Sequence, residues 1–302
     1  MKFLMEIIKG MFVGIANVIP GVSGGTMAVS FGIYDKIISS VTNLFKDFKK
    51  SVKTLFPIAM GVAIGVIAFS FIITDFLKYQ PFCTAAAFTG LIVGGVPAII
   101  AALKEGLKKD TKKSVPINVV VFIIFFAVSL AMPFLNGDSE SGILLTADAG
   151  TMVKVFFLGI IAAATMVIPG VSGSLVLMIL GYYFGIITAV KDFISGLKDF
   201  NFEVMWNNAL VLAPFAIGCV LGIFFISKLI EWLFNHYSSA TFCGILGLIV
   251  TSPVAIFYKV NQEYSLSNTS ILQILIGIAV CLLCIWVTIA MGKWESKVET
   301  ES

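Results

Sequence analysis

Long apolar stretches without charge constrain this chain more than any other feature. Residues 82–103, for example, contain no charged side chain. A helix needs about 20 apolar residues to cross a hydrocarbon core of about 30 Å. Because 59% of the 302 residues are hydrophobic and only 12% are charged, one soluble core could not hide this surface. We expect an all-α polytopic membrane protein.

The chain contains one internal duplication. Residues 10–38 align without a gap with residues 159–187, and the run VIPGVSG is identical in both. We therefore divide the chain into repeat 1, residues 1–145, and repeat 2, residues 146–302. Shorter matches follow in the same order, at Pro57 with Pro214 and at Gly90 with Gly247.

Each repeat is predicted to continue, after its motif, with three transmembrane helices. The expected spans are residues 55–77, 82–103, 116–135, 206–230, 240–258 and 270–291. The motif segments differ, because two apolar arms of about 11 residues each reach only about 16 Å. We expect segments 10–38 and 155–188 to form re-entrant helical hairpins with tips near the membrane midplane, surrounded by protein or a cavity.

The placement of lysines favours hairpins over full crossings. With hairpins and a cytoplasmic N-terminus, and Lys36 left aside, fourteen lysines face the cytoplasm and five face outward. Full crossings give at best twelve against seven. Since cytoplasmic loops are rich in lysine, both termini are expected in the cytoplasm. Three crossings per repeat would invert the second repeat relative to the first, as in many secondary transporters.

The two Pro-Gly-Val-Ser-Gly loops are the expected functional site. Proline and glycine interrupt a helix, and the first free N–H groups of the next helix can bind an anion. Alternatively, these small residues only allow helices to cross closely. The predicted phosphate-binding residues are Pro20, Gly21, Val22, Ser23, Gly24, Gly25 and Thr26 in the first copy, and Pro169, Gly170, Val171, Ser172, Gly173 and Ser174 in the second.

The sequence leaves two interpretations open for residues beside the first motif. All twenty basic residues are lysine, so an anion site must use lysines, hydroxyls, backbone N–H groups or helix ends. Asn17 is expected either to satisfy backbone groups freed by the helix break or to contact the ligand. Asp35 and Lys36 are expected at a membrane face, in a local ion pair or exposed, with Asp35 also open to a role in proton coupling.

Metal, redox and ATP chemistry have little support in the sequence. His236 is the only histidine, which excludes a multi-histidine metal site, and it is expected near a membrane face. The five cysteines lie in or beside apolar segments, and Cys281 and Cys284 have no second C-x-x-C partner. No GxxxxGK[ST] motif occurs. We therefore expect no metal, no cofactor and no nucleic-acid partner.

At the paired motifs, the sequence resembles the bacterial polyprenyl-phosphate transporter family, formerly a domain of unknown function. GIANVIPGVSGGTMAVSFGIYDKII is similar to its N-terminal signature, and the resemblance covers nearly the whole chain. It implies a flippase that returns undecaprenyl phosphate, the carrier lipid of cell-wall synthesis, from the outer to the cytoplasmic leaflet of the plasma membrane. The implied headgroup site is Pro20 to Thr26 with Pro169 to Ser174. Ser174 and Leu175 replace Gly25 and Thr26, so unequal contributions are expected.

Other functions stay open. A secondary transporter or channel for a small soluble anion would use the same helix-terminus site. A membrane phosphatase is disfavoured, because one histidine and no arginine offer few bases and cationic clamps; we therefore expect a protein that is not an enzyme. The sequence leaves open whether the protein is a homo-oligomer, which ion drives it and which lipid chain length it prefers.

Overall fold

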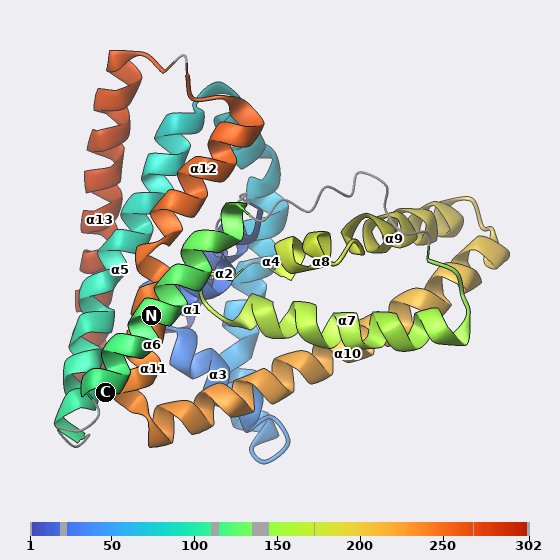
Figure 1. Ribbon diagram of the computed structural model, residues 1–302, viewed down its shortest axis with the longest axis horizontal. Coiled ribbons are helices and arrows are strands. Elements are labelled where there is room, and N and C mark those ends of the chain that lie inside the picture. Colours follow the sequence, from blue (N-terminus) through green and yellow to red (C-terminus); the bar gives the residue numbers. More distant parts are fainter. Residues whose placement is uncertain are drawn as a thin grey trace. The chain divides into compact units, whose positions relative to one another are not determined.

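The computed structural model describes residues 2–18, 23–109, 115–134, 145–171, 173–267 and 269–300. Within these ranges the chain is helical and has no strand, which confirms the all-α prediction (Figure 1). The helices are α1 (Lys2–Val18), α2 (Gly24–Ser30), α3 (Tyr34–Thr42), α4 (Phe48–Tyr79), α5 (Pro81–Lys109), α6 (Val115–Ala131), the 3-10 turn η2 (Met132–Phe134), α7 (Ala149–Val167), α8 (Gly173–Ile179), α9 (Tyr183–Lys198), α10 (Phe202–His236), α11 (Ser238–Val250), α12 (Ser252–Tyr264) and α13 (Ile271–Thr300).

Among the described residues, seven helical segments are long and apolar enough to cross a membrane, so the chain is a multi-pass membrane protein. Six of them match the predicted spans, and the seventh, Ala149–Val167, is the helix before the second motif. The predicted span 240–258 is interrupted at Thr251, between α11 and α12. That the motif segments re-enter the membrane, and that the second repeat is inverted, stay predictions.

The prediction that each motif lies between two helical arms of about 11 residues is wrong. The helices before the motifs, α1 and α7, have 17 and 19 residues, whereas α2 and α8 after them have 7 each. The first arms contain no proline, and their glycines, such as Gly10 and Gly159, lie within continuous helix at the crossings with α4 and α10. The second arms are short because each stops at a glycine with positive φ, Gly32 at 70° and Gly181 at 80°.

Packing contacts divide the chain into two compact units. Unit 1 comprises Met1–Pro133, Pro169–Val171 and Lys228–Ser302, and unit 2 comprises Phe134–Ile168 and Ser172–Ser227. Helix α10 therefore contributes to both. The first motif and residues 169–171 of the second motif belong to the same unit, which matters for the site described below.

In unit 1, α1 packs on α4 through glycines at the crossing. A Cβ atom at Gly10 would meet the carbonyl oxygen of Ile58, and one at Gly61 would meet that of Ile7. Small residues allow helix backbones to approach this closely in membrane proteins. Helix α13 approaches α5 in the same way, because a Cβ at Gly90 would meet the carbonyl oxygen of Cys281.

In unit 2, α7 packs on α10 by the same device. A Cβ at Gly159 would meet the carbonyl oxygen of Phe215, and one at Gly218 would meet that of Phe156. In the sequence alignment, Gly159 corresponds to Gly10, and Gly218 to Gly61. The core beside this crossing is apolar; its buried residues are Val155, Leu158, Ala162, Leu177, Ile186 and Val211.

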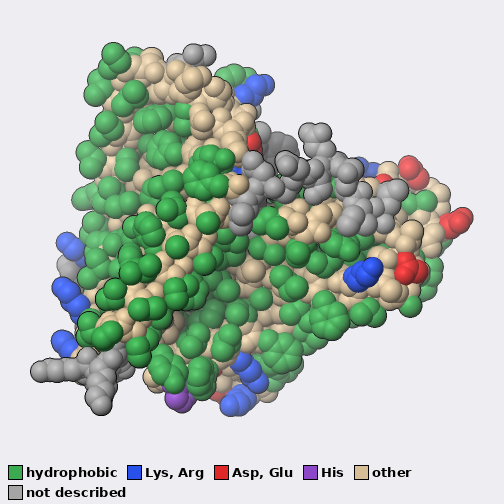
Figure 2. Space-filling model, in the orientation of Figure 1, with side chains coloured by type: hydrophobic (Ala, Val, Ile, Leu, Met, Phe, Trp, Pro, Cys, Tyr) green, Lys and Arg blue, Asp and Glu red, His purple; other side chains and the backbone are tan. Residues whose placement is uncertain are grey.

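Much of the exposed surface is apolar. Figure 2 shows hydrophobic side chains over much of the visible face. Helix α6 exposes Ile117, Val120 and Ile123 at 59%, 54% and 56%, and α13 exposes Leu275 and Trp286 at 60% and 67%. Surface of this kind is compatible with lipid as the surrounding solvent.

Candidate functional site

The first motif is a break between α1 and the short helix α2. Helix α1 ends at Val18, and Ser23 is the N-cap of α2, with extended backbone angles (φ −105°, ψ 132°) and no side-chain hydrogen bond to the helix. Ser23 and Thr26 are only 9% and 1% exposed. The predicted site residues Pro20, Gly21 and Val22 lie outside the described residues. The described part of the motif is therefore buried and carries two hydroxyls.

The second motif forms a turn that only glycine fits well. Gly170 has φ +76°, and a Cβ there would lie 2.9 Å from the carbonyl oxygen of Leu248. Pro169 and Val171 on either side are buried. Ser172 lies outside the described residues, while Gly173 begins α8. The helix break predicted at this motif is therefore present, with its turn enclosed by the protein.

A hydrogen bond joins the two motif copies within unit 1. The Gly170 backbone N–H donates to Thr26 Oγ1 at 2.7 Å. The sequence predicted that both groups face a ligand. Instead, the N–H of Gly170 is already paired, whereas the hydroxyl hydrogen of Thr26 can still be donated.

Equivalent side chains lie against the first glycine of each short helix. Asn17 donates from Nδ2 to the carbonyl of Val13 at 3.1 Å, and a Cβ added to Gly24 would lie 2.6 Å from Asn17 Oδ1. The exposed Asn17 thus bonds within α1, and its role as a ligand stays a prediction. In the second copy, a Cβ at Gly173 would meet the side chain of Met166, so the same place is apolar.

The other second-copy residue, Ser174, is exposed in α8, on the part of the motif that belongs to unit 2. In the first copy, the aligned residue is Gly25, which is half-buried at the start of α2. The structure therefore joins the two copies at Thr26 and Gly170, and residues 23–26 and 169–171 belong to unit 1.

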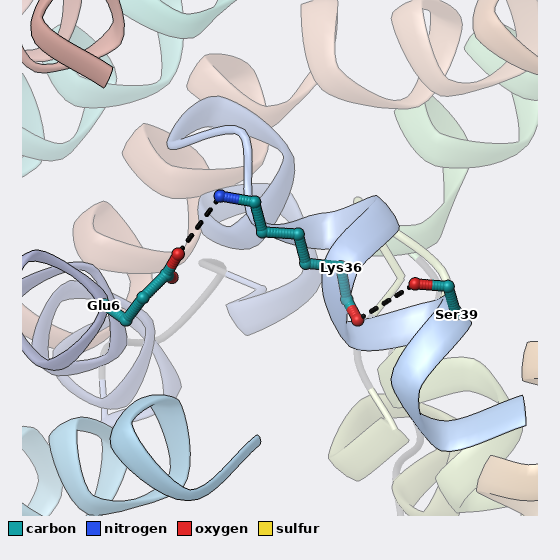
Figure 3. Close-up of polar contacts among 3 residues, drawn as sticks. All are labelled: Glu6, Lys36 and Ser39. Carbon is teal, nitrogen blue, oxygen red and sulfur yellow. Dashed lines mark hydrogen bonds and ion pairs between the residues drawn. The ribbon is translucent and has the colours of Figure 1, made fainter. Parts of the chain in front are cut away.

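Lys36 forms an ion pair, but not with its neighbour Asp35. Lys36 Nζ lies 3.1 Å from Glu6 Oε1, and Ser39 Oγ donates to the Lys36 carbonyl at 3.3 Å. Figure 3 shows both contacts. Asp35 is exposed in the first turn of α3, where a carboxylate is favourable. The predicted ion pair therefore links α1 to α3 rather than adjacent residues. Sequence reasoning missed Glu6, since its partner is 30 residues away.

Lys9 is a second charged residue that the sequence did not single out. It is fully buried on α1 at 0% exposure and has an interaction partner. A buried charge normally requires such a partner. A lysine followed by uninterrupted apolar residues was the available signal, but lysines near helix ends commonly extend to water instead.

The remaining titratable residues are placed as follows. His236 lies exposed at the end of α10 with its ring 5.0 Å from that of Trp232. Cys281 and Cys284 are half-buried in α13 with free thiols. Within the described ranges, no three His, Cys, Asp or Glu residues gather as a metal site.

The sequence matches the undecaprenyl phosphate translocase-like family over residues 13–274, a range that includes both motifs. The chain belongs to this family. Its relatives include a polyprenyl-phosphate transporter of Staphylococcus aureus, 29% identical over 280 residues, which are 92% of this chain and 94% of the relative. A polyprenyl-phosphate transporter of Vibrio cholerae is 27% identical over 264 residues, 83% of this chain and 76% of that relative. No solved structure matches. The family resemblance inferred from the motifs is confirmed.

Proposed function

We propose that this protein transports undecaprenyl phosphate from the outer to the cytoplasmic leaflet of a bacterial plasma membrane. The observation that carries the proposal is the family match, which extends across both motifs and most of the membrane helices. The relatives named polyprenyl-phosphate transporter cover nearly the same length of chain. Such a protein would recycle the carrier lipid rather than act as an enzyme on it.

The phosphate headgroup binds at the joined part of the two motifs. Ser23 and Thr26 offer hydroxyl donors in a buried setting, where a hydrogen bond to a charged phosphate oxygen is stronger than in water. Because α2 has only 7 residues, its dipole contributes less than the sequence suggested. The hydroxyls and nearby backbone N–H groups therefore supply most of the binding.

Transport follows alternating access. The headgroup passes along the motifs while the polyprenyl tail stays in lipid beside the apolar helix faces. Both termini lie in the cytoplasm, and the second repeat is inverted relative to the first. Asp35, exposed close to Lys36, is the residue available for proton coupling.

A reconstituted flipping assay tests this function. Purified protein in liposomes should move undecaprenyl phosphate between leaflets, measured over several pH values by the lipid phosphate accessible from outside. Ser23→Leu should slow movement by about tenfold or more, because one buried hydroxyl donor is lost and the break is filled. Ser267→Leu, at an exposed loop serine, is the matched control.

Three results would contradict the proposal. Equal rates for wild type and Ser23→Leu would remove the motif from the mechanism. Uptake of a soluble anion such as chloride or inorganic phosphate without lipid movement would select the small-anion transporter. Release of inorganic phosphate from labelled carrier lipid would indicate a phosphatase.

A further inference from the structure

Unit 1 contains a cavity with charged side chains in its wall, away from the motif residues described above. It has a volume of about 600 Å³ and is lined by parts of α1, α3, α4 and the turn that joins α3 to α4. The ion pair of Glu6 and Lys36, drawn in Figure 3, lies in its wall. Cavities with a few convergent polar groups are the usual form of a small-ligand site.

The cationic groups of this cavity are not all neutralised. Lys36, Lys50 and Lys53 line it together with two carboxylates, those of Glu6 and Asp47. Lys36 is held by Glu6, but neither Lys50 nor Lys53 forms an ion pair with any described residue. The ammonium groups of these two lysines are therefore available to form ion pairs with an anion in the cavity.

The same wall holds buried hydroxyls without a partner. Ser40 and Ser51 are 9% and 2% exposed, and their side chains make no hydrogen bond to the described part of the chain. Glu6 Oε2 is likewise buried without a hydrogen-bond partner among the described residues. The two serine hydroxyls are therefore available to bond a ligand in the cavity, whereas Glu6 Oε2 is enclosed by the protein.

We propose that this cavity is a second binding site, for a phosphate monoester. A phosphate monoester carries a charge of about −1.5 to −2 and three acceptor oxygens, which match the lysines and serine hydroxyls. The ligand is either a lipid headgroup or free phosphate; that it is the transported lipid rests on the proposed function.

Occupancy would change the ion pair. Phosphate oxygens compete with Glu6 for Lys36, because both are acceptors for the same ammonium group. The two members of the pair should therefore affect binding in opposite directions. Removing the charge of Lys36 weakens binding, whereas removing the charge of Glu6 strengthens it. If the ion pair only stabilised the fold, removing the charge of either residue would weaken binding.

The lysines lie where the topology predicts the cytoplasmic side. Lys50 and Lys53 are at the start of α4, in the loop assigned to the cytoplasm by lysine placement. In the proposed direction of transport, a site there receives the headgroup after it leaves the motifs. The cavity would bind the headgroup on the cytoplasmic side before the lipid is released.

The test measures binding to purified full-length protein in detergent micelles, by titration calorimetry with farnesyl phosphate, inorganic phosphate and farnesol. Wild type should bind two equivalents of farnesyl phosphate and no farnesol. The double variant Lys50→Gln with Lys53→Gln should lose one equivalent or weaken it about tenfold, and Glu6→Gln should tighten the same equivalent about threefold. Binding of inorganic phosphate at this equivalent would show that the lipid tail is dispensable.

The matched control is Lys46→Gln with Lys49→Gln, two lysines of the same segment that line a neighbouring cavity but not this one. Equal weakening by this control would mean attraction by the basic surface alone, and would overturn the site. Weaker binding in Glu6→Gln would also overturn it. Loss of binding only in Ser23→Leu would reject the second site and leave the proposed function standing. Absence of lipid flipping by wild type, with phosphate binding still sensitive to Lys50 and Lys53, would reject the function and leave the site.

Discussion

The turns that follow the two motif copies share one backbone structure but differ in chemistry. After the first copy, the N–H groups of Phe31, Gly32 and Ile33 donate to the carbonyls of Met27, Val29 and Ala28. After the second, the N–H groups of Leu180, Gly181 and Tyr182 donate to those of Val176, Met178 and Leu177, the aligned positions. Both are helix ends closed by a glycine in the left-handed region.

The surrounding side chains differ where the backbones agree. Asn17 lies against Gly24 in the first copy, and Met166 lies against Gly173 in the second. Thr26 in the first copy is aligned with Leu175. The two copies therefore share the backbone structure, but at these two positions only the first copy has a polar side chain, whereas Ser174 of the second copy replaces Gly25. The first copy should carry more of the headgroup binding.

The helix crossings are the strongest test of equivalence. Gly61→Leu and Gly218→Leu should each prevent folding. The added side chain would overlap a carbonyl oxygen of the neighbouring helix, which lowers the free energy of unfolding by about 3 kcal/mol or more. The measurement is recovery of monodisperse protein after detergent extraction. Gly292→Leu, with no atom within 4 Å of a Cβ, is the control and should be recovered normally. If Gly218→Leu folded and Gly61→Leu did not, the two helix crossings would not be structurally equivalent.

Substitutions of the turn glycines, Gly32 and Gly181, should have the next largest effect on stability. Gly32→Ala and Gly181→Ala should each destabilise the protein by about 1–2 kcal/mol, since a Cβ is disfavoured at φ of 70° and 80°. Thermal unfolding in detergent measures the effect. Asparagine tolerates this conformation better, so Gly32→Asn and Gly181→Asn should lose less. Equal losses for alanine and asparagine would show that space, and not backbone conformation, requires glycine.

The chemical difference is tested at Thr26. Thr26→Val should slow lipid flipping about fivefold and destabilise the protein by about 1 kcal/mol, because the Gly170 N–H loses its acceptor. Ser174→Ala, in the exposed part of the second copy, should change flipping less than twofold, by roughly 0.4 kcal/mol or less. If Ser174→Ala were the more harmful, the assignment of headgroup binding to the first copy would be reversed.

The smallest effect is expected at Asp148, the N-cap of α7. Hydrogen bonds from Thr146 and Thr151 hold the pKa of the Asp148 carboxyl well below its usual range, and its Oδ1 accepts from the Thr151 N–H at 3.0 Å. A carboxyl with a lowered pKa stabilises the fold above its unfolded pKa, about 3.9, and this contribution is lost only as pH falls further.

Asp148→Ala should therefore lower the melting temperature slightly and by the same amount at pH 5 and pH 8, with Asp148→Asn in between. Circular dichroism on heating measures this. A difference between wild type and Asp148→Ala that grows from pH 5 to pH 8 would show that the carboxyl titrates in that range, contrary to its hydrogen bonding.

The sequence predicted the features that depend on long patterns. Apolar stretches located six membrane helices, and the duplicated motif located the two helix breaks that precede Gly24 and Gly173. Pairings between distant residues were not predictable, because they depend on how helices pack. The bond from Gly170 to Thr26 spans 144 positions, and the ion pair of Lys36 selected Glu6 over the adjacent Asp35. Arm length was also missed, since an apolar segment does not show where its helix begins.

The bond between Thr26 and Gly170 has a consequence for the order of events in a transport cycle. It has one donor and one acceptor, and an incoming oxyanion can replace the hydroxyl as acceptor for the same N–H. Binding of the phosphate headgroup would then break the hydrogen bond between the two motif copies, and release of the headgroup would allow the bond to form again. The bond would therefore be present in the empty carrier and absent in the loaded one, so cargo itself would set how tightly the two copies are held together.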